Sequence, residues 1–120
     1  MARTPEGKVK DWLYKKMETR YPESWRYSPP AGPFGVIGVA DSLWVIKAGQ
    51  HLIFVAVECK ADSSCVPTTP QIKYLTKMKS LGAVAAVMKG KDTAKLLSIF
   101  KAIDDRKIFL ESLPKVEDLL

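Results

Sequence analysis

The sequence is poor in the side chains that hold structural zinc, with two cysteines and one histidine among 120 residues. A closed zinc site needs four such ligands, so this class of site is excluded. We expect the two thiols, Cys59 and Cys65, to remain free, because a reducing compartment does not favour a disulfide between them.

Long hydrophobic runs are also missing. No stretch approaches the roughly 20 apolar residues of a membrane span, and the N-terminus lacks the apolar region of a secretory signal. We therefore expect a cytoplasmic protein without a membrane partner. A length of 120 residues predicts one domain, residues 1–120, too short to hold a target-reading domain beside a catalytic one.

Acidic residues are in the minority, with 13 Asp and Glu against 19 Lys and Arg and a net charge of +6. This balance favours a polyanionic partner such as nucleic acid, but does not identify it. The glycine pattern of nucleotide-binding loops is missing too. Gly32, Gly35 and Gly38 precede an expected strand, where such a loop requires a helix.

The pattern of caps and apolar residues predicts an α/β fold. Thr4 is a good N-cap and Pro5 suits a first helical position, which predicts a helix from Pro5 to about Tyr21. Two apolar runs, 43–46 and 52–57, are joined by a short turn with glycine and predict a β-hairpin. The second run is apolar at every position, which predicts a central strand covered on both faces.

The second half of the sequence predicts a helix, a strand and another helix. Thr68 to Gln71 is typical of a helix start and Gly82 of a helix end. The apolar run 83–88 predicts a buried strand, reached by a parallel crossover, and Asp92 caps a last helix. We expect the apolar segment 108–120 to cover the sheet or a second subunit.

The hairpin carries a constellation that suits metal chemistry. Asp41 stands at the entry of its first strand, and Glu58 and Lys60 stand at the end of its second. Alternate residues of a strand share a face, so Glu58 and Lys60 project from one side while Cys59 points to the other. Two carboxylates and an ammonium group at one end of a hairpin can hold a divalent metal and a water molecule.

Four short motifs occur in order: Thr4-Pro5-Glu6, Gly38-x-x-Asp41, Glu58-x-Lys60 and Thr69-Pro70-Gln71. Together they resemble the VRR-NUC branch of the PD-(D/E)XK nucleases over roughly residues 4 to 90. That family usually has proline before its aspartate, whereas this chain has Ala40. The resemblance implies a restriction-endonuclease-like core, in which a mixed central sheet is flanked by helices.

The resemblance also implies a metal-dependent DNA endonuclease. Asp41 and Glu58 would bind Mg²⁺ or Mn²⁺, and Lys60 would assist the attacking water. Strand geometry would add the backbone carbonyl of Cys59 as a further ligand. Glu6 and Gln71 would complete the site, Glu6 directly or through a water molecule. Both stand in the first turn of a helix, so capping or dipole roles remain alternatives.

For DNA contacts the sequence offers Arg26, beside the site, and Lys73 and Lys77 on the helix that follows. Trp25 and Phe34 are more typical of side chains that fill a core beneath a loop. The resemblance implies a stand-alone, phage-type enzyme in the host cytoplasm. It further implies an enzyme that resolves branched DNA such as Holliday junctions. A domain this small can hold one active site and paired cuts need two, so we expect a homodimer.

Other functions remain compatible with the sequence. One is a non-catalytic accessory protein for DNA binding or recombination that keeps the nuclease fold, and another is a less selective DNA nuclease. If the chain is a dimer, the apolar tail and the hairpin that carries Trp44 are the candidate contact surfaces.

Overall fold

The three helices of the computed structural model, which describes residues 3–29 and 38–120, begin at caps formed by side chains. The helices are α1 (Pro5–Arg20), α2 (Thr69–Ser80) and α3 (Thr93–Glu111). Thr4 Oγ1 accepts a hydrogen bond from Gly7 N at the start of α1, and Asp92 caps α3 in the same way. The helix starts predicted from the sequence are therefore confirmed.

Four strands form one mixed sheet in the order β1-β2-β3-β4. They are β1 (Ser24–Tyr27), β2 (Ser42–Ala48), β3 (His51–Lys60) and β4 (Val84–Lys89). Strands β1, β2 and β3 pair antiparallel, whereas β4 runs parallel to β3 after the α2 crossover. The predicted hairpin, the parallel crossover and the α/β class are confirmed.

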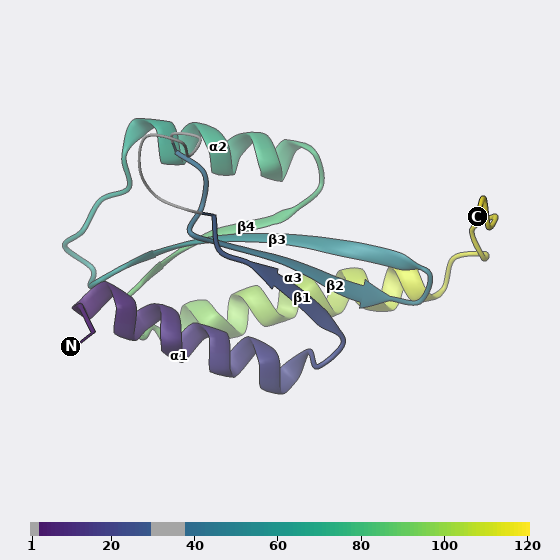
Figure 1. Ribbon diagram of the computed structural model, residues 1–120, viewed down its shortest axis with the longest axis horizontal. Helices are drawn as coiled ribbons and strands as arrows, with labels where there is room; N and C mark the ends of the chain where they lie inside the picture. The colour runs from purple at the N-terminus through teal and green to yellow at the C-terminus, as the bar shows by residue number, and fades with distance from the viewer. Residues whose placement is uncertain (1–2, 30–37) are drawn as a thin grey trace.

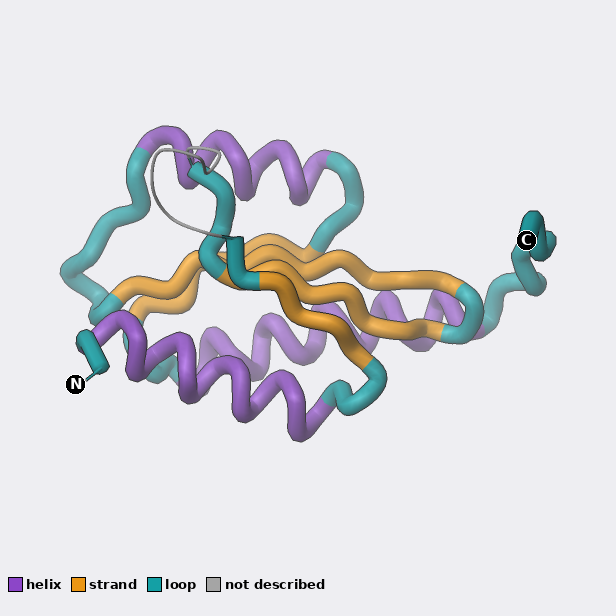
Figure 2. The backbone as a smooth tube through the Cα atoms, in the orientation of Figure 1, coloured by secondary structure: helices purple, strands orange, loops and turns teal. Residues whose placement is uncertain are grey.

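The sheet lies between two layers of helices (Figure 1). Helices α1 and α3 cover one face, and α2 covers the other, as the backbone trace in Figure 2 also shows. The larger core lies under α1 and α3 and includes Leu13, Trp44, Val57 and Ile103. Within the described residues, none of the helices is both long and apolar enough to cross a membrane.

The α2 face of the sheet is only partly covered, which corrects two predictions. The register places Trp25, Val45 and Phe54 side by side. Trp25 is 63% exposed and Leu52 is 68% exposed. The prediction that Trp25 fills the core is wrong, and β3 is covered on both faces only from Val55 onward. The core prediction for Phe34 lies outside the described residues.

The C-terminal segment 108–120 was predicted to cover the sheet or a second subunit. Only its start packs on the core, through Leu110, and contact with a second subunit stays a prediction. Ile108 and Phe109 belong to the last turns of α3, and the apolar side chains after it, including Leu119 and Leu120, are exposed. Trp44 lies in the hairpin that was predicted as a dimer surface, and that surface stays a prediction. Trp44 is 1% exposed and packs against Tyr14, so it cannot itself contact a second subunit.

A close backbone approach brings the start of α2 against Gly38, which lies shortly before the hairpin. Gly38 has a φ of 83°, and a Cβ atom there would lie 2.5 Å from the carbonyl carbon and oxygen of Pro70. Only glycine accepts both the positive φ and this approach to backbone atoms. The contact fixes the first turn of α2 next to Asp41.

Gly82 provides a matched control for this contact, because its φ is 103° but a Cβ atom there would have open space around it. We predict that Gly82→Ala lowers the free energy of unfolding by about 1 kcal/mol, the cost of a positive φ. Gly38→Ala should cost about 2 kcal/mol more, because the added methyl group overpacks against Pro70. Urea unfolding of the two variants checks this, and equal losses would show that the approach of Pro70 is unimportant.

Candidate metal centre

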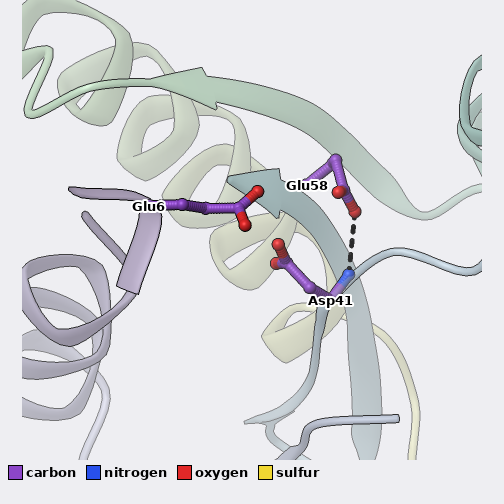
Figure 3. A group of neighbouring side chains, drawn as sticks. All are labelled: Glu6, Asp41 and Glu58. Carbon is purple, nitrogen blue, oxygen red and sulfur yellow. Dashed lines mark hydrogen bonds between the residues drawn. The ribbon is translucent and has the colours of Figure 1, made fainter. Parts of the chain in front are cut away.

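Three carboxylates meet at the end of the sheet where β3 finishes. One oxygen each of Glu6, Asp41 and Glu58 lies within 4.8 Å of the other two. Figure 3 shows the three side chains pointing toward one another from α1, from the residue before β2 and from β3. The structure thus brings together three residues that the sequence places far apart, and all three were predicted as site residues.

Asp41 and Glu58 hold each other through the backbone. Glu58 Oε2 accepts a hydrogen bond from the backbone N–H of Asp41 at 3.0 Å, and Asp41 Oδ2 accepts one from the N–H of Cys59 at 3.1 Å. The pairing of Ser42 with Val57 in the hairpin register brings the two acids opposite each other. These reciprocal hydrogen bonds hold both carboxylates in place at the end of the strands. They also satisfy the N–H groups of Asp41 and Cys59, which have no partner in the strand ladder between β2 and β3.

Burial strongly affects the protonation of this pair. It raises the pKa of Glu58, and with the negative charge of Asp41 the value reaches about 7, despite the Asp41 N–H and nearby Lys60. Burial also raises the pKa of Asp41, although the hydrogen bond from Cys59 and the charge of Lys10 oppose the shift. A buried acidic pair of this kind gains stability from a cation that compensates its charge.

Lys60 and Gln71 both reach Glu58. Lys60 Nζ lies 3.6 Å from Glu58 Oε1, with 15% of the lysine side chain exposed. Gln71 Nε2 donates a 2.9 Å hydrogen bond to the same oxygen, and its Oε1 accepts one from Thr68 N. Gln71 therefore completes the capping box of α2 and also contacts a candidate ligand, while its catalytic role stays a prediction.

Glu6 is brought to the site by the packing of α1. Val9, Leu13 and Met17 are buried under the sheet, which sets the rotation of the helix and turns the half-buried Glu6 toward Asp41. Glu6 also stands in the first helical turn, where a carboxylate complements the helix dipole. Its position is compatible with both predicted roles.

Cys59 contributes through its backbone alone. Its side chain is buried in the core under α1 and α3, on the opposite face from Glu58 as the strand alternation predicted. The observed contact is the N–H group that binds Asp41. Metal binding by the Cys59 carbonyl stays a prediction.

The sequence did not identify a hydroxyl pair behind Asp41. Ser42 is fully buried, and its Oγ lies 3.1 Å from both Asp41 Oδ1 and the hydroxyl of Tyr14. A hydroxyl has one proton and a carboxylate only accepts, so Ser42 donates to Asp41 and accepts from Tyr14. The pattern gave no signal for this pair, because tyrosine on a helix and serine on a strand are ordinary.

Arg26 takes part in the same chain of contacts. Its guanidinium lies 3.7 Å from the centre of the Tyr14 ring and donates to Ser28 Oγ, which is 3.3 Å from the Tyr14 hydroxyl. Arg26 is therefore packed on the α1 side of the sheet, against the tyrosine that bonds Ser42. Its contact with DNA stays a prediction, as do those of Lys73 and Lys77, which are exposed on α2.

Lys10 is a further residue that the sequence analysis missed. Its Nζ lies 3.7 Å from Asp41 Oδ2, and 27% of its side chain is exposed. The available signal was its spacing, since a residue four positions after Glu6 lies on the same side of a helix.

The donor set suits a hard divalent cation. Mg²⁺ binds oxygen ligands at about 2.1 Å, so opposite ligands are separated by about 4 Å. The carboxylate oxygens of Glu6, Asp41 and Glu58 need only a small inward movement, or bridging waters, to reach such an ion. Without sulfur or imidazole in the cluster, Mg²⁺ or Mn²⁺ fits these residues better than a soft metal.

The protonation of Glu58 gives a testable dependence on pH. Because its folded pKa of about 7 exceeds the ordinary 4.5, the metal-free protein loses stability as the pH rises between these values. The loss should reach about 3 kcal/mol. We predict that the difference in unfolding free energy between wild type and Glu58→Gln falls by this amount from pH 4.5 to 7.5, measured by urea unfolding with a chelator. A difference that does not change with pH would contradict the assignment.

Comparisons with known proteins identified no relative of this chain. Neither the scan against protein-family models nor the searches of curated proteins and of solved structures found a match for the chain.

Proposed function

We propose that this chain is a metal-dependent DNA endonuclease of the VRR-NUC branch of the PD-(D/E)XK superfamily. The observation that carries the proposal is the convergence of Glu6, Asp41 and Glu58 on one point, with Lys60 beside them. These are the acidic and basic residues of the motifs that resemble the family. A mixed sheet flanked by helices agrees with the core that the family would require.

The surroundings of the carboxylates favour a phosphate substrate. The N-termini of α1 and α2, which carry Glu6 and Gln71, lie at the site, and helix N-termini attract anions. Lys60 adds an ammonium group on the side of Glu58. An anionic substrate would therefore meet positive charge around the acidic cluster.

A bound Mg²⁺ or Mn²⁺ would supply an activated water and compensate the charge of the transition state. Asp41 and Glu58 would hold the ion, and their backbone hydrogen bonds keep both carboxylates in place. Lys60 would orient the water or contact the scissile phosphate. The hydrogen bond from Gln71 would hold the Glu58 carboxylate in place. Gln71 itself would remain within reach of the substrate.

Substitution of the central residues tests the activity. We predict that Asp41→Ala, Glu58→Ala or Lys60→Ala abolishes Mn²⁺-dependent cleavage, because each removes a metal ligand or the cation beside the ligands. The fold should remain intact. Gln71→Ala and Glu6→Ala should slow cleavage less. A gel assay on linear duplex, single-stranded, flap and four-way junction DNA measures this, with circular dichroism as the control for folding. Wild-type protein that binds DNA but cuts none would instead indicate an accessory protein.

We further propose a homodimer that resolves branched DNA. A chain of this size holds one such site, and paired cuts in two strands need two sites, most simply related by a two-fold axis. The uncovered part of the α2 face offers a contact surface. It has exposed Trp25 and Phe54, and Leu52 and Phe54 line an apolar cavity of about 280 Å³ with Met78 and Leu81.

Two leucines provide matched variants for the dimer. Leu52 is 68% exposed on this face, and Leu97 is 59% exposed on α3, on the opposite side of the sheet. We predict that Leu52→Glu gives a monomer, because a carboxylate resists burial in an apolar interface, whereas Leu97→Glu remains a dimer. Light scattering at micromolar concentration checks the masses. A wild-type monomer that cuts linear duplex and junctions equally would leave a less selective nuclease.

A further inference from the structure

Among the described residues, Lys10 is the one lysine of α1 that forms an ion pair with the acidic cluster of Glu6, Asp41 and Glu58. It follows Glu6 by one helical turn, and the burial of Val9 and Leu13 holds this side of α1 against the end of the sheet. Its Nζ lies 3.7 Å from Asp41 Oδ2. Lys8, by contrast, is exposed on another side of the same helix.

The charge of Lys10 is stabilised by its neighbours. A lysine side chain is ordinarily protonated at neutral pH, and the Asp41 carboxylate lies next to the Lys10 ammonium group. Lys10 therefore remains an ammonium group at the site. It approaches the cluster from the side of Asp41, whereas Lys60 approaches from the side of Glu58.

The formal charges limit how many ions the site can accept. Metal binding requires ionised carboxylates, so Glu6, Asp41 and Glu58 together carry three negative charges against the two positive charges of Lys10 and Lys60. One divalent cation leaves the site with a single positive charge, which matches the single negative charge of a phosphodiester. A second divalent cation would leave three positive charges within a few ångströms, with mutual repulsion.

We propose that Lys10 is a phosphate-contacting cation of this site and takes the place of a second divalent ion, so that the site binds one. This proposal rests on the proposed nuclease function. Before the substrate arrives, Lys10 pairs with Asp41. When a divalent ion binds Asp41, the ion repels the ammonium group of Lys10. The ammonium group then leaves the carboxylate and turns to the phosphate.

Loss of the positive charge of Lys10 should strengthen metal binding and slow DNA cleavage. Lys10→Met removes the charge at similar length, Lys10→Arg retains it, and Lys8→Met is the control on the same helix. Free Mn²⁺, followed by electron paramagnetic resonance without DNA, should show one ion per wild-type chain and several-fold tighter binding by Lys10→Met. Cleavage by Lys10→Met should be about 10- to 100-fold slower, largely restored in Lys10→Arg, and unchanged in Lys8→Met.

A purely structural role for Lys10 would misplace Asp41 and weaken Mn²⁺ binding and cleavage together, which would overturn the proposal. Two ions per wild-type chain, or cleavage by Lys10→Met at the wild-type rate, would also overturn it while leaving the proposed nuclease function in place. Wild-type protein that neither binds Mn²⁺ nor cuts DNA would overturn both.

Discussion

The reciprocal hydrogen bonds between Asp41 and Glu58 are the constraint on which the site depends. Each carboxylate accepts from the backbone at the other's strand, so the position of one fixes the other. The bonds are possible because the hairpin register continues one residue beyond the last ladder pair, Ser42 with Val57. A slip of one residue in that register would turn Glu58 into the core and leave Asp41 without a partner.

Around this pair the remaining parts of the fold act as supports from different sides. Helix α2 adds Gln71 and is held in position by the contact of Pro70 with Gly38. Helix α1 adds Glu6 and Lys10, while Tyr14 reaches Asp41 through buried Ser42. The bare part of the sheet and the exposed tail lie at the other end of the molecule (Figure 1), so the site and the candidate dimer surface can vary independently.

Local sequence signals were sufficient for most of the fold and for the central acids. Thr4, Thr68 and Asp92 act as caps through short-range geometry, and strand alternation places Glu58 and Cys59 on opposite faces. What local signals lack is the reach and rotation of one element against another. That is why the exposure of Trp25, the fate of the tail and the contacts of Lys10, Tyr14 and Ser42 became visible only in the structure.

The far end of α1 determines when the site can be completed. There Tyr21 packs on Phe100 and donates a hydrogen bond to Asp104, which also pairs with Arg20. Helix α1 precedes the four described strands in the sequence, but these partners belong to α3, which follows them. The placement of Glu6 and Lys10 thus depends on α3 as well as on the packing of α1 against the sheet. Nuclease activity, as proposed here, would appear only after α3 has packed against α1.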